Sequence, residues 1–382
     1  MLPTTLPTET ASPEAAHPGP QNTPTISDQD RYSRQILFPG IGAHGQQLLA
    51  SAHIAIVGVG ATGAATASLL ARAGVGTLTL VDRDFVEPSN LQRQVLFDEA
   101  DARDSLPKAE AARRKITLFN SSVTVLPRIA DLVPANIDEL FSPVGTTPIQ
   151  LILDATDNFE TRYLINDYAV RNSIPWIYAA AIGAYAATMN ILPDGPHRTA
   201  CLACIFPKPP TGPVETCDTS GILSTAVNLA ASLQATEALK LLTGQPQLMR
   251  RTLLSFDLWT LANKGSLESS EISTASPDPD CDVCGKRIFS HLAGEGRPHI
   301  TLCGRNSVQI HERHRPVDLP AMRDRLAQHA DLTDVRANGL LLRFRVRRTD
   351  HTLTLFSDGR AVIQGTTDTT LARSLYARFI GS

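Results

Sequence analysis

The chain has 382 residues, with 35 Lys and Arg against 38 Asp and Glu and a formal net charge of −3. This length can hold one large domain and a smaller one. The near balance of charge argues against a nucleic-acid partner, and no run approaches the ~18 apolar residues of a membrane span.

Residues 1–30 are rich in Pro, Thr and acidic residues, and they contain neither Lys nor Arg nor an apolar run of signal-peptide length. They predict a disordered N-terminal tail on a cytoplasmic protein. Six cysteines in such a chain are not expected to form disulfides, which leaves metal binding or catalysis to consider.

A helical segment, RYSRQILFPGIGAHGQQLLASA, precedes a strand, a Gly-rich turn, a helix and a second strand in HIAIVGVGATGAATASLLARAGVGTLTLVDRD. Strand and helix signals then alternate through VTVLPRIA, PANIDELF, IQLILDATD and NFETRYLINDYAVRNS. This alternation predicts a Rossmann-like α/β fold, with a doubly wound, mostly parallel sheet covered on both faces. Two strands around a Gly follow in IPWIYAAAIGAYAATMNILP, and then a long helix that stops at Gly244.

A polar stretch, LESSEISTASPDPDCDVCGKR, indicates a domain boundary after a main domain at residues 31–285. Strand signals follow in HITLCGRNSVQIHE, GLLLRFRVRR, HTLTLFSDG and RAVIQGT, with helix signals in LPAMRDRLAQHA and TLARSLYARFIGS. They predict a small two-layer α+β domain at residues 290–382. We expect a structural role for Cys303 and a solvated surface turn for HERHR.

The turn GVGATG places Gly58, Gly60 and Gly63 at the spacing of a dinucleotide fingerprint. The first two allow a tight turn and close approach to phosphate, and the third lets the helix pack on the strand. Asp82 ends the next strand, where a carboxylate can accept hydrogen bonds from ribose. Together they predict a nucleotide site with phosphates over the helix N-terminus.

The residues after this acid favour ATP over NAD or FAD. Cations, amides and carboxylates follow at positions that the fold would bring to one edge of the sheet; they are Asn90, Arg93, Gln94, Lys108, Asp154 and Asp157. Cations suit phosphate chemistry and an Asp can hold Mg²⁺, whereas hydride transfer needs no such array. No GxxxxGK[ST] occurs, which excludes a P-loop ATPase.

At this point the sequence resembles the ThiF/MoeB-like adenylyltransferases, which are related to the ubiquitin-activating enzymes. The matching text is RYSRQILFPGIGAHGQQLL, VGVGATG, LVDRDFVEPSNLQRQ, PKAEAA, DATDNFETRYLIND, CLAC, TCDTSGILSTAV and CDVCG. The resemblance implies an enzyme that binds MgATP, adenylates the C-terminal glycine carboxylate of a ubiquitin-like protein and releases pyrophosphate.

Residue by residue, the resemblance implies that the three glycines cradle phosphate and that Asp82 binds ribose. It implies triphosphate contacts from Asn90, Arg93, Gln94 and Lys108, a magnesium ligand in Asp157, and an arginine, Arg34, that reaches the partner subunit's ATP site in a homodimer. One departure concerns Ser105, which stands where the family usually has Gly and could slightly alter the reach of Lys108.

The cysteines come as two pairs, Cys201/Cys204 and Cys281/Cys284, and one further candidate, Cys217. Four thiolates can enclose a structural Zn²⁺, and neither pair sits between a strand and a helix as redox CxxC motifs do. Cys217 lies just before the long helix, whose N-terminus would lower its pKa; the family gives such a cysteine a covalent sulfur-transfer or thioester role in some members only.

The predicted protein is therefore a zinc-stabilised, homodimeric adenylyltransferase that activates a ubiquitin-like sulfur carrier for thiamine or molybdopterin biosynthesis. Its sulfur donor would be a cysteine desulfurase or a rhodanese, and the C-terminal domain is hypothesised to dock the carrier or the donor. Two alternatives stay open: a non-catalytic binding module for a ubiquitin-like protein, and an NAD- or FAD-dependent oxidoreductase.

Overall fold

The computed structural model describes residues 27–142, 145, 147–209, 220–261, 266–294, 307–311, 317–337, 339, 341–356 and 359–381. Within these residues the chain forms a large mixed sheet and a smaller antiparallel sheet, each with helices packed against it. No helix in the described part of the chain is long and apolar enough to cross a bilayer.

Eight strands form the larger sheet: β1 (His53–Val57), β2 (Thr77–Val81), β3 (Thr124–Arg128), β4 (Leu151–Asp154), β5 (Trp176–Ile182), β6 (Tyr185–Ile191), β7 (Thr252–Leu261) and β8 (Leu267–Ser273). Their order is β3-β2-β1-β4-β5-β6-β7-β8. Neighbours from β3 to β5 run parallel, and those from β5 to β8 run antiparallel. The parallel half has the strand order of a dinucleotide-binding fold, which confirms the predicted fold class.

Helices cover this sheet on both sides: α1 (Asp28–Arg31), α2 (Ser33–Ile36), α3 (Gly42–Ser51), α4 (Ala61–Ala73), η1 (Pro88–Asn90), α5 (Glu99–Arg103), α6 (Lys108–Phe119), α7 (Ile137–Phe141), α8 (Phe159–Asn172), α9 (Leu202–Ile205), α11 (Ser224–Leu242) and η2 (Pro246–Leu248). Helices α3, α4, α6 and α11 pack into one core, and α7 and α8 into the other.

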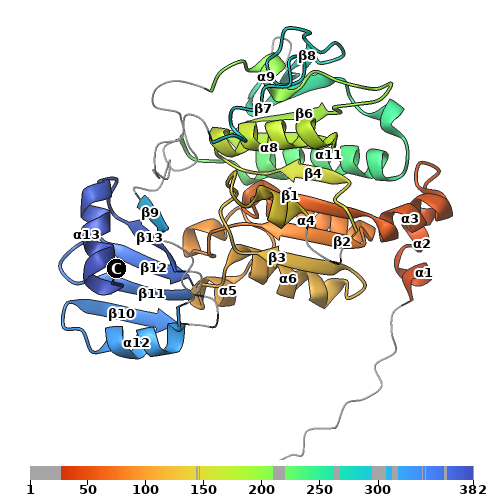
Figure 1. Ribbon diagram of the computed structural model, residues 1–382. Coiled ribbons are helices and arrows are strands. Elements are labelled where there is room, and N and C mark those ends of the chain that lie inside the picture. Colours follow the sequence, from red (N-terminus) through yellow and green to blue (C-terminus); the bar gives the residue numbers. More distant parts are fainter. Residues whose placement is uncertain are drawn as a thin grey trace, which may run out of the picture.

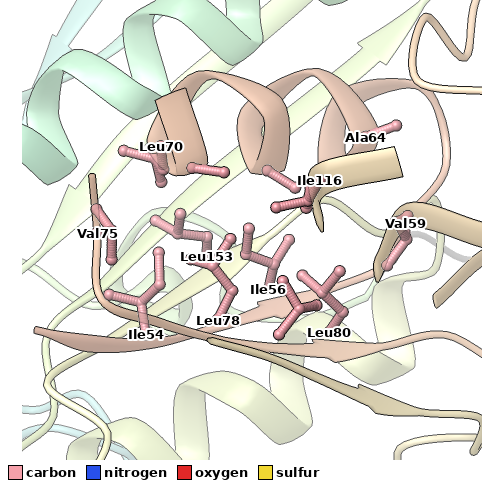
Figure 2. Packing of buried hydrophobic residues seen from close by; sticks show 14 of the residues in the cluster. Ile54, Ile56, Val59, Ala64, Leu70, Val75, Leu78, Leu80, Ile116 and Leu153 are labelled. Atoms are coloured by element: carbon pink, nitrogen blue, oxygen red, sulfur yellow. The ribbon is translucent and has the colours of Figure 1, made fainter. Parts of the chain in front are cut away.

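Successive side chains of the central strands point to opposite faces of the sheet and contribute to the two hydrophobic cores in turn. Ile54 and Ile56 of β1 pack against α4 and α6, as Figure 2 shows, whereas Ala55 and Val57 face α7 and α8. A strand that is apolar at every position is buried on both faces, as expected for parallel strands between helices.

The smaller sheet holds β9 (Ser307–His311), β10 (Leu332–Ala337), β11 (Leu341–Val346), β12 (Thr352–Phe356) and β13 (Arg360–Gln364), in the order β10-β11-β12-β13-β9. Helices α12 (Leu319–Ala327) and α13 (Thr369–Phe379) pack on one face of it. Figure 1 shows this sheet beside the β3 edge of the larger one. It is the predicted small α+β domain.

Several elements differ from or refine the expectations, and among them strand β7 and helices α5 and α6 were not predicted. Strand β8 lies in the polar stretch that was predicted to be a domain boundary, and all of its residues are exposed, as befits the edge of a sheet. Strand β10 was not predicted, because Leu332 is the only buried residue in it and the strand shows no regular alternation of buried and exposed positions. Helix α11 ends at Leu242, and Gly244 follows with a φ of +79°, which agrees with its predicted role as a helix stop.

Candidate functional site

The glycine-rich turn between β1 and α4 forms one wall of a pocket. Gly58 has a φ of +83°, and a Cβ there would lie 2.7 Å from the carbonyl oxygen of Ala155. A Cβ on Gly63 would lie 1.8 Å from the carbonyl oxygen of Gly58, so both positions require glycine. Around Gly60, the atom that a Cβ would meet is a side-chain nitrogen of Gln94 at 3.9 Å, which leaves room for a ligand.

Helix α4 points its N-terminus into this pocket. It begins directly after Gly60, no side chain of the described residues caps it, and Ala61 and Thr62 line the pocket. Uncapped N–H groups and the helix dipole together favour an anion such as phosphate.

The pocket lies where the parallel strands end, which is where open α/β sheets bind ligands. Its walls come from the glycine-rich turn, the ends of β2, β3 and β4, and the starts of α6 and α8. Seven of the residues predicted from sequence line it: Gly58, Gly60, Asp82, Arg93, Gln94, Lys108 and Asp157.

Asp82 joins two of these walls. Its Oδ2 accepts a hydrogen bond from the N–H of Val59 at 2.6 Å, and its Oδ1 accepts one from the N–H of Asp84 at 2.7 Å. Burial raises the pKa of Asp82, while the nearby charge of Lys108 acts to lower it. The carboxylate thus holds the glycine-rich turn in place as well as facing the pocket.

Lys108 starts α6 and is almost fully buried. Its Nζ lies 3.2 Å from Oδ2 of Asp84, and its N–H donates to the carbonyl oxygen of Asp84 at 2.9 Å. Ser105, the departure from the family pattern, has a φ of +48°. The loop before Lys108 therefore keeps the left-handed backbone that glycine favours, and the lysine still reaches the pocket.

Arg93 and Gln94 follow the 3₁₀ turn η1. A terminal nitrogen of Arg93 donates to the carbonyl oxygen of Ser89 at 2.8 Å, which aims the side chain along the turn. Gln94 is buried and lines the pocket, and its Oε1 has no hydrogen-bond partner in the described part of the chain. Asn90 is buried inside the turn, where its Oδ1 accepts from the N–H of Glu87 at 3.1 Å, and its contact with triphosphate stays a prediction.

Two carboxylates at the end of β4 differ in burial and in partners. Asp154 is buried and pairs with Arg162 at 3.2 Å; burial raises its pKa, and Arg162 opposes this. Asp157 is exposed at the pocket wall and makes no ion pair or hydrogen bond among the described residues. A free carboxylate beside a phosphate pocket fits Mg²⁺, which prefers one or two carboxylates together with phosphate oxygens.

Sequence reasoning missed Arg83 and Asp131, which also line the pocket and pair at 3.0 Å. Burial alone would lower the pKa of Arg83, but the negative charges of Asp131, Asp84 and Asp157 outweigh the effect of burial, and the pKa is raised. Arg83 could have been predicted from sequence, because it directly follows Asp82 at the end of β2, where ligands bind in this fold. Asp131 lies in a loop, where no motif marked it.

Two candidates lie away from this pocket. Arg34 is exposed on α2 and is not among the residues that line the pocket of its own chain. It is followed by Leu37 and Phe38, whose exposed fractions are 71% and 61%. Cys217 lies outside the described residues, as does Cys303.

The two cysteine pairs meet in space. The Sγ–Sγ distances are 3.8 Å from Cys201 to Cys204, 3.6 Å from Cys201 to Cys281 and 3.4 Å from Cys204 to Cys284. All four Sγ atoms lie within 4.8 Å of one another. Tetrahedral zinc with Zn–S bonds of about 2.3 Å places its sulfurs about 3.8 Å apart, so the donor set and spacing fit Zn²⁺.

The surroundings of the cluster also fit a structural metal. Three of the thiols are buried, and the side-chain amide of Asn166 donates to Sγ of Cys201 at 3.7 Å. A guanidinium nitrogen of Arg198 donates to the carbonyl oxygen of Cys284 at 2.8 Å. Four cysteines leave no position open for a substrate, so zinc here would tie the segment at residue 281 to α9 and to Cys201, the residue before that helix.

Comparison with known proteins shows which proteins resemble this chain in sequence and fold. The ThiF family model matches residues 32–283. The sulfur carrier protein ThiS adenylyltransferase of Bacillus subtilis is 43% identical over 354 residues, which are 92% of this chain and 99% of that protein, so the match extends into the smaller sheet. The SAMP-activating enzyme E1 of Haloferax volcanii is 37% identical over 67% of this chain and 89% of its own length.

Among solved structures, Escherichia coli MccB bound to MccA-N7isoASN aligns with a TM-score of 0.56 at 23% identity, over 68% of this chain and 75% of that one. At this identity the likeness shows the fold alone. The family match and the Bacillus relative show more: the chain belongs to the ThiF family.

Proposed function

We propose that this protein is an adenylyltransferase that uses MgATP to activate the C-terminal glycine carboxylate of a ubiquitin-like sulfur-carrier protein. The observation that carries the proposal is the pocket, which is lined by an uncapped helix N-terminus, by Lys108 and Arg93, and by the carboxylate of Asp157. The Bacillus relative, which is a ThiS adenylyltransferase and matches 92% of this chain, supports the same reaction.

The reaction requires alignment and charge stabilisation more than proton transfer. An oxygen of the carrier's carboxylate bonds to the α-phosphorus of ATP while the bond to pyrophosphate breaks, and the nucleophile needs no base because it is already ionised. Lys108 and Arg93 would stabilise the charge that develops on the phosphates. Asp157 would hold Mg²⁺, which when bound neutralises phosphate charge.

The later steps belong to the same proposal. The persulfide sulfur of a donor, a cysteine desulfurase or a rhodanese, would displace AMP from the acyl-adenylate and form an acyl disulfide. A second thiol would then attack the donor's cysteine sulfur, which forms a disulfide between the two cysteines and releases the thiocarboxylate of the carrier. Cys217, which precedes α11 in the sequence, is our candidate for carrying sulfur or a thioester during this transfer. The name of the Bacillus relative favours a ThiS-like carrier and thus thiamine over molybdopterin biosynthesis; a cytoplasmic location stays a prediction from the sequence.

We further propose that the enzyme is a homodimer in which Arg34 completes the partner subunit's site. The support is that Arg34 is exposed next to Leu37 and Phe38, two large apolar side chains that are also exposed. Adjacent exposed apolar residues are typical of protein interfaces.

The decisive experiment is ATP–pyrophosphate exchange by the purified protein, with each ubiquitin-like small protein of the same genome supplied in turn. The control is the same carrier without its terminal glycine. We expect exchange with one carrier and none with its truncated form. Tight binding of MgATP without exchange for any carrier would contradict the proposal and favour a non-catalytic binding module.

A further inference from the structure

The smaller sheet packs directly behind the nucleotide pocket. Residues 82–84 and 130–132 line the pocket, and the residue next to each segment, Phe85 or Ile129, turns away from it. Phe85 and Ile129 pack in one apolar cluster with Leu341, Phe356 and Val362 of the smaller sheet. Figure 1 shows the two sheets meeting on this side of the molecule. The wall of the pocket is thus also the interface between the sheets.

One charged residue of the smaller sheet takes part in this interface. Strand β11 buries Leu342 and Phe344 against its helices and turns Arg343 to the opposite face, toward the pocket wall. The guanidinium carbon of Arg343 lies 4.5 Å from the centroid of the Phe85 ring. A terminal nitrogen of Arg343 lies 4.0 Å from Oε1 of Glu87, and burial lowers the pKa of this arginine.

The segment that Arg343 touches is linked to the backbone that carries two of the pocket cations, Lys108 and Arg93. The carbonyl oxygen of Asp84 accepts from the N–H of Lys108 at 2.9 Å, and Phe85 forms a bridge with Pro107, the residue before it. On the other side, the N–H of Glu87 donates to Asn90 of η1, the turn that leads to Arg93. Whatever fixes residues 85–87 therefore fixes the backbone from which Lys108 and Arg93 reach the pocket.

We propose that Arg343 is a positioning residue for the nucleotide site, which holds residues 85–87 by stacking on Phe85 and pairing with Glu87. The smaller sheet is then a brace for ATP binding, a role different from docking a carrier or a sulfur donor. A planar guanidinium can stack and pair at once, whereas a lysine ammonium keeps the charge and loses the stacking. The inference rests on the proposed function in that the pocket binds MgATP.

The test uses the full-length protein and direct binding of MgATP by calorimetry, without a carrier. A cation–π contact is equivalent to about 2- to 30-fold in affinity, so we expect Arg343→Ala to weaken MgATP binding by that factor. Arg343→Lys should recover part of the loss. Arg345→Ala is the matched control, because Arg345 is an exposed residue on the same face of β11 that makes no ion pair among the described residues. It should bind MgATP as the wild type does.

Two further measurements separate positioning from general stability. In the exchange assay, Arg343→Ala should raise KM for ATP and leave KM for the carrier unchanged. Phe85→Leu combined with Arg343→Ala should weaken MgATP binding less than the two separate effects multiplied, because both remove the same contact. Wild-type affinity in Arg343→Ala, or an equal loss in Arg345→Ala, would overturn the inference.

The inference can fail independently of the proposed function. If no carrier supports exchange but MgATP binding still depends on Arg343, the adenylation proposal fails and the inference holds. If exchange occurs with one carrier and MgATP binds equally to the wild type and to Arg343→Ala, the proposed function holds and the inference fails.

Discussion

Lys108 combines deep burial with a charge, and this makes its role testable. Its side chain is 3% exposed, and its charge is balanced by Asp84 at 3.2 Å. With a triphosphate in the pocket, Lys108 would contact phosphate oxygens as well as Asp84. We therefore expect Lys108→Gln to lower kcat/KM for ATP by about 10²–10³-fold in the exchange assay. Arg114→Gln is the control, since Arg114 lies on the same helix, is 52% exposed and pairs with Glu110. A Lys108→Gln enzyme as active as this control would contradict the assignment.

Ser105 gives a second prediction for a single residue. Its φ of +48° is a conformation that side chains disfavour by about 1 kcal/mol, whereas glycine adopts it freely. The greater entropy of glycine in the unfolded chain offsets part of this gain, so we expect Ser105→Gly to raise the free energy of unfolding by about 0.5 kcal/mol. Urea denaturation without nucleotide measures this.

The control for this prediction is Ser121→Gly, at an exposed loop position without a positive φ, which should give no gain. A loss of stability in Ser105→Gly would show that the serine side chain, and not the backbone, governs this loop.

Among the strands, those that are buried at every position could be predicted from sequence, whereas a fully exposed edge strand could not. Strands β1 and β4 are buried at every position, and their apolar runs identified them. Strand β8 is exposed at every position and offers no alternation to detect. Its strand conformation comes from pairing with β7, which is long-range information.

The site divides in the same way. Residues that directly follow a strand, such as Gly58 and Asp82, were predictable because their place in the fold follows from the local pattern. The pairing of Asp84 with Lys108, the burial of Asn90 and the contact of Arg343 with Phe85 join segments that no local pattern connects. Spacing predicted the two cysteine pairs, but only the fold shows that their thiols meet.

The cysteine cluster predicts a metal-dependent element. We expect about one zinc per chain, which Cys281→Ser would weaken or remove. If four thiolates share about 10 kcal/mol equally, the loss of one costs about 2–3 kcal/mol of stability and lowers the melting temperature. Metal analysis and thermal melting, with and without a chelator, measure both effects.

Cys303→Ser is the matched control for the zinc prediction, because Cys303 lies outside both CxxC pairs of the sequence. It should keep the zinc content, and a chelator should lower its melting temperature as it lowers that of the wild type. A wild-type protein that contains no zinc and melts at the same temperature with a chelator would contradict the structural-metal assignment.

At the scale of the assembled enzyme, the proposed role of Arg34 in the dimer can be tested by mixing two inactive variants. Each proposed site combines Arg93 of one chain with Arg34 of the other. Homodimers of Arg34→Ala or Arg93→Ala therefore have two defective sites, whereas a mixed dimer has one site with both arginines and one with neither.

Mixing the two inactive variants should therefore restore activity. With free exchange of subunits, half of the dimers are mixed and half of their sites are complete, so about one quarter of wild-type exchange activity should return. The measurement is ATP–pyrophosphate exchange after the two variants are co-expressed with different tags, with each variant alone as the control. If the mixture stays as inactive as its components while each variant sediments as a dimer, then Arg34 does not act across the interface, because a site shared between chains must be rebuilt by such mixing.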